Sequence, residues 1–280
     1  MMMSGMKGAE TDTADANSVR YPSGDAPYYV PIGNELEVFA ACHARGLPVM
    51  LKGPTGCGKT RFVEHMAWRL KRPFITIVCH DDLSASDLTG RYLIRGGETV
   101  WSDGPLTIAA RTGAICYLDE LVEARQDTVV VTHSLTDDRK LLSIDKTGEL
   151  VKAAPGFQLV ASYNPGYQHA IKDLKPSTRQ RFVTLEFDFP PPNVEADIIA
   201  HESGVKRATA VALVTLASRV RRLREEGLAE APGTRLLVAT ARLVASGVPV
   251  GEACKVALAN PLTDDPDLLS AISDLVATTM

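Results

Sequence analysis

The sequence has little that would tie it to a membrane, to nucleic acid or to an oxidising compartment. No run approaches about 18 consecutive apolar residues, and residues 1–10 lack the apolar stretch of a signal peptide. The 30 basic and 34 acidic residues give a formal net charge of −4 with no basic block, which argues against nucleic-acid binding. The five cysteines are scattered without metal-ligand spacing and are odd in number, which argues against disulfides. We therefore expect a cytoplasmic protein that binds no nucleic acid and does not insert directly into a membrane.

Three regions differ in their patterns. Residues 1–27 are polar and small, which predicts a disordered N-terminal tail. Over residues 28–190, short apolar runs alternate with helical patterns, which predicts an α/β nucleotide-binding domain with a parallel five-stranded sheet and flanking helices. Residues 191–280 show only helical patterns, which predicts an α-helical lid domain. The expected strands are residues 48–52, 74–79, 114–118, 157–163 and 183–187.

A glycine-rich stretch, GPTGCGKT, occupies residues 53–60 between an apolar run and an amphipathic helical pattern. It matches G-x-x-x-x-G-K-[ST], in which backbone N–H groups and a helix N-terminus surround phosphates. Lys59 would reach the β- and γ-phosphates, and the Thr60 hydroxyl would bind Mg²⁺. The alternative is a strand-to-helix turn with an exposed lysine. The predicted nucleotide-binding residues are Gly53, Pro54, Thr55, Gly56, Cys57, Gly58, Lys59 and Thr60.

Two carboxylates end the apolar run ICYLDE at residues 115–120. Ligands of open α/β sheets bind at the carboxyl ends of the strands. Asp119 would hold Mg²⁺, through water, and Glu120 would polarise the water that attacks the γ-phosphate. The alternative is that both acids cap the next helix, a role compatible with catalysis.

Four further polar residues are candidates for the same site. Asn164 follows the run at 157–163 and could hydrogen-bond the attacking water or the γ-phosphate, although Asn before Pro is also an ordinary turn residue. Arg179 and Arg181 could neutralise charge on the phosphoryl group, from within the chain or from a neighbouring subunit, or form surface ion pairs. Arg235 lies in the first turn of a lid helix, where a cation is unfavourable unless something requires it.

Two other hypotheses concern a thiol and a metal. Cys57 lies at a helix N-terminus, which could lower its pKa and favour oxidation; the alternative is that it fills space. His80, Asp81 and Asp82 could form a metal cluster, but adjacent side chains do not easily converge on one ion.

In this order, the motifs GPTGCGKT, ICYLDE, SYNPG, STRQRF and PGTR resemble those of AAA+ ATPases. The sequences of these motifs resemble those of the MoxR class and its CbbQ/NorQ (NirQ) branch, and the resemblance covers about residues 28–270. The resemblance implies that the first two motifs are Walker A and Walker B. It also implies that Asn164 is sensor 1, that Arg181 is the leading arginine-finger candidate with Arg179 second, and that Arg235 is sensor 2.

Two strand-turn-strand patterns, at residues 87–106 and 137–156, predict projecting β-hairpins. They match the positions of the family's insertion in the second helix and of its hairpin before sensor 1. Hairpins with no core role are places where a partner could bind, and ordinary surface hairpins are the alternative. Residues 79–87 lack the aromatic-hydrophobic pair of many threading motors, so straightforward peptide threading is not expected.

The family resemblance implies an ATP- and Mg²⁺-dependent homo-hexameric ring that remodels a protein client with a von Willebrand A-domain adaptor. The implied client is either rubisco, freed of inhibitory sugar phosphates, or nitric oxide reductase during assembly of its metal centre. The sequences of the motifs favour rubisco. Two other classes stay open from the residues alone: a P-loop small-molecule kinase and a scaffold that binds ATP without turnover. Glu120 next to Asp119 favours water as the acceptor.

Overall fold

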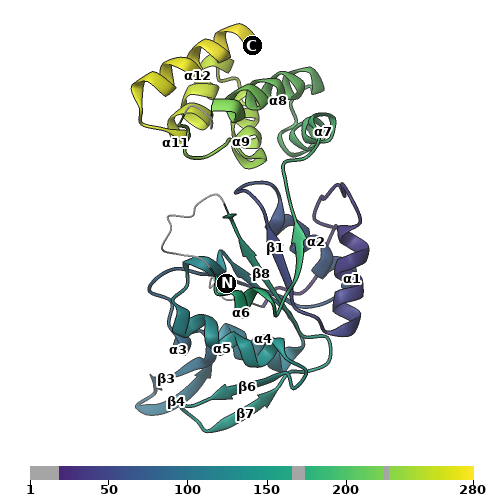
Figure 1. The fold of residues 1–280 in the computed structure, drawn as a ribbon, viewed down its shortest axis with the longest axis vertical. Helices are drawn as coiled ribbons and strands as arrows, with labels where there is room; N and C mark the ends of the chain where they lie inside the picture. The colour runs from purple at the N-terminus through teal and green to yellow at the C-terminus, as the bar shows by residue number, and fades with distance from the viewer. Residues whose placement is uncertain (1–18, 166–173, 224–226) are drawn as a thin grey trace, which may run out of the picture.

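Five parallel strands form the sheet of the N-terminal part of the chain (Figure 1). The structure, a computed structural model, describes residues 19–165, 174–223 and 227–280. The strands lie in the order β2-β5-β8-β1-β9, and each agrees with a predicted run to within one residue at either end. They are β1 (Val49–Lys52), β2 (Phe74–Val78), β5 (Ile115–Asp119), β8 (Gln158–Tyr163) and β9 (Val183–Glu186). The predicted five-stranded parallel sheet is confirmed.

Helices cover both faces of this sheet. In β5, Ile115 and Tyr117 pack on the face covered by α1 (Glu35–Arg45) and α2 (Lys59–Leu70). The alternate residues Cys116 and Leu118 pack on the other face. That face is covered by α3 (Ala85–Thr89), α4 (Pro105–Thr112) and α5 (Gln126–Thr136). Because both faces are buried, the central strands are apolar without alternation in sequence.

Both predicted hairpins form, but they differ in burial. The first pairs β3 (Gly90–Arg95) with β4 (Glu98–Asp103), and its Ile94 is 81% exposed. The second pairs β6 (Leu141–Ile144) with β7 (Glu149–Lys152), and Leu142, Ile144 and Val151 join the core beside α4 and α5. The prediction that neither hairpin has a core role is wrong for the second, because its alternate apolar side chains face those helices.

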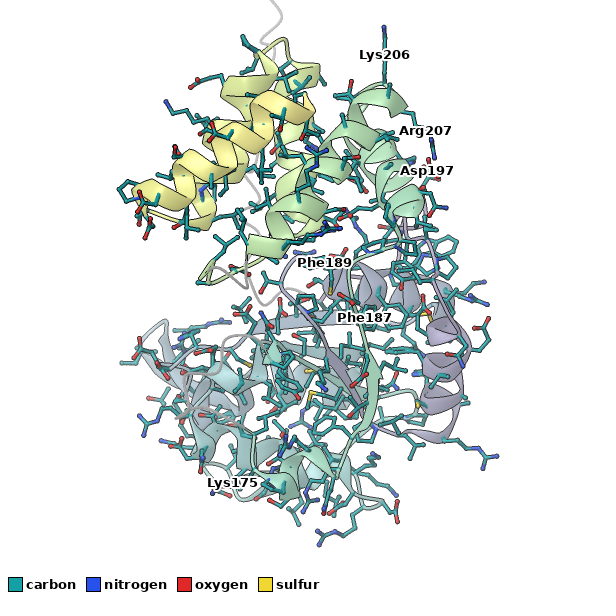
Figure 2. All side chains as sticks on the ribbon, turned by 45° about the horizontal axis from the view of Figure 1, so that its top comes forward. Lys175, Phe187, Phe189, Asp197, Lys206 and Arg207 are labelled. Carbon is teal, nitrogen blue, oxygen red and sulfur yellow. The ribbon has the colours of Figure 1, made fainter. Side chains whose placement is uncertain are left out.

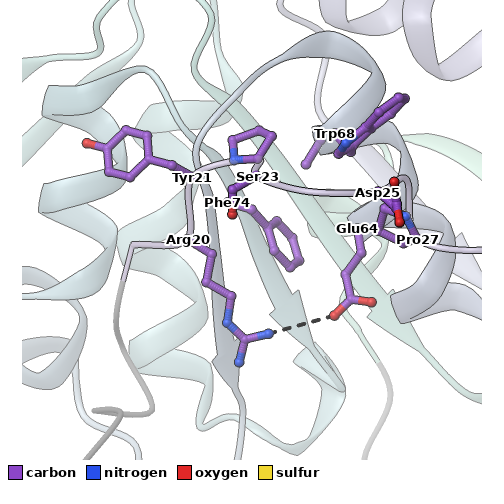
Figure 3. A pocket seen from close by; sticks show the side chains of 10 residues that line it. Arg20, Tyr21, Ser23, Asp25, Pro27, Glu64, Trp68 and Phe74 are labelled. Carbon is purple, nitrogen blue, oxygen red and sulfur yellow. Dashed lines mark ion pairs between the residues drawn. The ribbon is translucent and has the colours of Figure 1, made fainter. Parts of the chain in front are cut away.

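Part of the segment predicted as a tail packs on the domain. The backbones of Arg20 and Phe74 exchange two hydrogen bonds of 2.9 and 2.8 Å, and Trp68 Nε1 donates to the Gly24 carbonyl at 3.1 Å. Residues between 20 and 27 line a small cavity of about 230 Å³ together with residues of α2, and Arg20 forms an ion pair with Glu64 there (Figure 3). Residues 1–18 lie outside the described part of the chain.

The helical part of the chain follows Pro191 and has an apolar core of its own. None of the helices described in any part of the chain is long and apolar enough to span a bilayer. The helices are α7 (Pro192–Ser203), α8 (Arg207–Arg222), α9 (Thr234–Ala245), α10 (Val250–Cys254), the π-helical turn η4 (Lys255–Ala259), α11 (Asn260–Leu262) and α12 (Pro266–Thr279).

The linker between the two parts is anchored on both sides. Phe187 and Phe189 lie on it in succession, with Phe189 nearer the helical part (Figure 2). The Phe187 ring packs against Phe62 of α2 with 5.1 Å between centroids. The Arg221 guanidinium of α8 lies 3.9 Å from the centre of the Phe189 ring. The two aromatic rings therefore couple the linker to each part separately.

Candidate nucleotide-binding site

A cavity of about 670 Å³ lies at the carboxyl edge of the sheet, between the sheet and the helical part. Its volume is in the range of small-molecule sites. Most of the predicted site residues line it together, although they come from four separate motifs. These residues are Thr55, Gly56, Cys57, Gly58, Lys59, Thr60, Asp119, Glu120, Asn164 and Arg235.

The loop at residues 53–60 uses its glycines in two ways. Gly56 and Gly58 have φ of +72° and +103°, left-handed values that other residues adopt only with strain. Gly53 is needed for close packing, because a Cβ there would collide with the Phe187 carbonyl. Gly53 and Pro54 do not line the cavity, but their carbonyl groups accept hydrogen bonds from Lys59.

The Lys59 side chain is held inside this loop. Its Nζ donates to the carbonyl oxygens of Gly53 and Pro54, both at 2.8 Å, and the residue is 9% exposed. Burial lowers the pKa of Lys59. The alternative of an exposed lysine is therefore wrong. Phosphate oxygens would be stronger acceptors for this ammonium group than the two neutral carbonyls.

The two acids at the end of β5 have different surroundings. Asp119 is half-buried, and its Oδ1 accepts hydrogen bonds from the hydroxyls of Tyr117 (2.8 Å) and Ser162 (2.7 Å). Glu120 has a left-handed φ of +57°, and its N–H donates to Ser162 Oγ at 3.0 Å. Burial raises the pKa of Glu120, and the charge of Asp119 raises it further.

The capping alternative for Glu120 is wrong. This residue precedes the short helix η1 (Leu121–Glu123), but its side chain makes no capping hydrogen bond there. The next helix, α5, has Arg125 at its N-cap. The Glu120 carboxylate is instead part of the cavity wall.

Asn164 joins the end of β8 to the glycine-rich loop. Its Nδ2 donates to Thr55 Oγ1 at 2.9 Å, so the side chain faces the cavity and does more than turn the chain. The rest of the predicted motif, from Gly166 onward, lies outside the described residues.

The three arginines are placed differently. Arg235 lines the cavity from the first turn of α9. The start of α9 abuts the loop, since a Cβ on Gly233 would lie 2.6 Å from the Thr55 carbonyl oxygen. Arg179 ends α6 (Pro176–Arg179), Arg181 follows it, and both are exposed and absent from the cavity wall. The fold therefore does not bring these two arginines to the cavity of their own chain.

Comparisons with known proteins agree with this geometry. Residues 48–182 match the model of an AAA domain of the dynein-related subfamily, and residues 195–279 match the C-terminal model of CbbQ/NirQ/NorQ. The chain is 60% identical over 253 residues to protein NorQ of Paracoccus denitrificans, covering 90% of this chain and 94% of that one. The chain belongs to the CbbQ/NirQ/NorQ family of AAA ATPases. It is 58% identical to protein CbbQ of Hydrogenophilus thermoluteolus, covering 88% and 92% of the two chains.

A solved structure shares the fold of this ATPase. A RuvB variant from Thermotoga maritima matches with a TM-score of 0.53 over 88% of this chain and 71% of that one. The identity is 18%, so this match shows the shared fold alone.

One end of the cleft has no counterpart among the predicted residues. The residues that line it there come from the segment before α1, together with residues of α7 and α9; those of the segment are Tyr28, Tyr29, Val30 and Ile32. The Tyr28 ring stacks on His201 with 3.6 Å between centroids. Such an apolar, aromatic end suits a planar base. The sequence signal was the apolar run YYVPI, which has no place in the sheet.

A buried ion pair inside the lid was also missed. Glu195 of α7 is 0% exposed and accepts two hydrogen bonds from Arg221 of α8, at 2.9 and 2.7 Å. The Thr234 hydroxyl, at the start of α9, donates to the same carboxylate at 2.7 Å. The pair therefore fixes the end of α9 that carries Arg235.

The residues present fit a magnesium nucleotide. The Thr60 hydroxyl and the Asp119 carboxylate offer the oxygen ligands that Mg²⁺ prefers. Within the described residues, no group of three or more His, Cys, Asp or Glu side chains could hold a metal, so the hypothesis of a cluster at His80, Asp81 and Asp82 is wrong. Burial raises the pKa of Cys57, so the hypothesis of a lowered pKa is also wrong.

Proposed function

We propose that this ATPase binds Mg²⁺ and ATP in the cleft, hydrolyses ATP with water as the acceptor, and uses the cycle to remodel a protein client in the cytoplasm. The observation that carries the proposal is the position of Glu120. Its carboxylate lines the same cavity as Lys59 and Asn164, one residue beyond the metal candidate Asp119. A base beside a phosphate-binding loop is the arrangement that hydrolysis requires.

Each residue then has a distinct task. The N–H groups of the loop and Lys59 hold the β- and γ-phosphates, while Thr60 and Asp119 would hold Mg²⁺, which supplies charge neutralisation. Glu120 takes the proton from the attacking water. Asn164, whose amide donates to Thr55, orients that water or the γ-phosphate.

Arg235 links the lid to this chemistry. It lines the cleft from the start of α9, which abuts the loop at Gly56. We propose that it contacts the γ-phosphate and reports its presence to the lid. Movement of the lid would then follow the nucleotide state.

We further propose a homo-hexameric ring in which each cleft is completed by a neighbour. Arg179 and Arg181 are exposed but lie outside the cleft of their own chain. An arginine in this position stabilises a phosphoryl group only if it acts across a subunit interface. Arg181 is the leading candidate and Arg179 the second.

For the client, we propose one of the two enzymes implied by the family resemblance, rubisco or nitric oxide reductase, engaged with a von Willebrand A-domain adaptor. The identities to CbbQ and NorQ, 58% and 60%, are too close to favour either. The projecting β3–β4 hairpin, with exposed Tyr92, Ile94 and Val100, supports contact with a partner.

Phosphate release measured across protein concentrations tests the ATPase ring. Specific activity should rise with assembly, and no acceptor other than water should be required. ADP formation that depends on an added small-molecule acceptor would instead indicate a kinase. Binding without turnover would indicate a scaffold.

The client is tested by adding inhibited rubisco or unactivated nitric oxide reductase, each with its candidate adaptor, to the wild-type chain and to Glu120→Gln. One client should be activated by the wild-type chain and not by Glu120→Gln. Activation of neither would contradict the proposed pair of clients while leaving the ATPase assignment intact.

A further inference from the structure

Two buried hydroxyl groups lie directly behind Asp119. The Tyr117 hydroxyl donates to Asp119 Oδ1 at 2.8 Å, and the Ser162 hydroxyl donates to the same oxygen at 2.7 Å. Tyr117 and Ser162 are both 0% exposed, and neither lines the cleft. Any effect of these hydroxyls on a bound ligand must therefore pass through residues that do line it.

Tyr117 also reaches the second candidate ligand of Mg²⁺. Its hydroxyl oxygen lies 3.4 Å from Thr60 Oγ1. A tyrosine hydroxyl carries one hydrogen, and here that hydrogen is used in the shorter bond to Asp119. Of the two hydroxyls, only Thr60 can then be the donor, which leaves the lone pairs of its oxygen for a cation.

The arrangement of β5, β8 and α2 brings these side chains together. Tyr117 and Asp119 are two residues apart on β5 and so point to the same face of the sheet, the face covered by α2. Thr60 is the second residue of α2. Ser162 lies on the neighbouring strand β8, one residue beyond Ala161, which pairs with Leu118. The hydroxyls thus converge from two strands and one helix.

We propose that Tyr117 and Ser162 are positioning residues for the magnesium site. They hold Asp119 by Oδ1, so that its second oxygen is available to the metal or its water, and Tyr117 accepts the hydrogen of the Thr60 hydroxyl, which leaves the lone pairs of Thr60 Oγ1 for the metal. The three hydroxyls and the carboxylate form one network in which each bond polarises the next. This inference rests on the proposed use of Mg²⁺ and ATP.

Ser162 has a second task in the same network. Besides donating to Asp119, its Oγ accepts the N–H of Glu120 at 3.0 Å. Glu120 is one of three described non-glycine residues with positive φ, and such a conformation persists only where neighbours hold it. Ser162 therefore sets the relative positions of the metal-binding acid and the base.

The test is Tyr117→Phe, which removes one hydroxyl and keeps the ring. Equilibrium binding of a fluorescent ATP analogue is measured in EDTA and then against free Mg²⁺. The affinity for the analogue in EDTA should stay within about 2-fold of wild type. The Mg²⁺ concentration that produces half of the Mg²⁺-dependent change in that affinity should rise about 10-fold or more, as for other residues that orient metal ligands. Ser162→Ala should show the same shift and also a lower kcat.

The matched control is Thr132→Val. Its hydroxyl is equally buried but, among the described residues, bonds to the Val129 carbonyl within α5, at 2.7 Å. It should keep the wild-type Mg²⁺ midpoint, and melting temperatures of all variants are measured alongside. A Tyr117→Phe variant that lost affinity equally in EDTA and in Mg²⁺ would have a structural defect only, which overturns the inference.

Two outcomes separate the inference from the proposed function. A wild-type midpoint in Tyr117→Phe, with a normal response of the wild type to Mg²⁺, overturns the inference alone. A wild-type chain whose nucleotide binding and hydrolysis ignore Mg²⁺ overturns the proposed metal chemistry, and the inference with it.

Discussion

The side-chain amide of Asn164 donates a hydrogen bond of 2.9 Å to the Thr55 hydroxyl, across 109 positions of the sequence. This bond ties the end of a central strand to the glycine-rich loop at residues 53–60. The wall of the cleft is therefore connected before a nucleotide arrives.

Lys59→Ala should abolish nucleotide binding. The variant removes the ammonium group that the loop holds with two carbonyl oxygens at 2.8 Å, and with it the main positive charge for the β- and γ-phosphates. Equilibrium binding of a fluorescent ATP analogue measures the loss. Lys52→Ala is the control, because Lys52 pairs with Glu186 outside the cleft and should bind normally.

The rate of ATP hydrolysis should fall when the pH is lowered, and the fall should begin at a pH above the ordinary pKa of a glutamate. Glu120 must be deprotonated to accept a proton from water, and burial with the nearby charge of Asp119 raises its pKa. The acid limb of the kcat/KM profile, which reports groups of the free enzyme, should therefore lie above pH 4.5, the ordinary value for this side chain. A kcat/KM that stays constant down to that pH would contradict the assignment of Glu120 as the base.

Arg181→Ala should retain nucleotide binding and lose turnover. Because Arg181 lies outside the cleft of its own chain, subunits with an intact Arg181 should compensate for its loss in mixed rings. Mixing Arg181→Ala with Glu120→Gln subunits should restore phosphate release, since some clefts then combine an intact base with an intact arginine. Arg179→Ala mixed in the same way is the comparison. Absence of rescue in both mixtures would contradict an arginine acting across the interface.

Arg221→Ala should destabilise the lid strongly. It leaves the carboxylate of Glu195, which is 0% exposed, without its two charged hydrogen bonds, and such a loss costs about 3–5 kcal/mol. The control is Asp197→Ala on α7, the helix that carries Glu195. Its exposed pair with Arg207 (Figure 2) is worth about 0.2–1 kcal/mol. Urea unfolding measures both, and equal effects would contradict a special role for the buried pair.

The sequence predicted the elements whose signals are local. The strands and the glycine-rich loop follow from short apolar runs and from a spacing that backbone geometry requires, as in residues 53–60. It also placed Asp119, Glu120 and Asn164 at one edge of the sheet, because parallel strands end together.

What the sequence could not predict depends on contacts between distant segments. Tyr117 and Ser162 look like ordinary residues of buried strands, and their hydroxyls gain a role only from the pairing of β5 with β8. Glu195 looks like one more charge on a mixed helix until Arg221 is placed against it. The burial of the second hairpin likewise depends on packing against α4 and α5.

The most direct test of the account is a single-turnover experiment with Glu120→Gln. The variant and the wild type are loaded with radiolabelled ATP and Mg²⁺, and phosphate release is followed with time; Glu123→Gln, outside the cleft wall, is the control. Glu120→Gln should retain ATP but release phosphate at least about 100-fold more slowly, the loss expected for a general base. Release at the wild-type rate would contradict the assignment of Glu120 as the base.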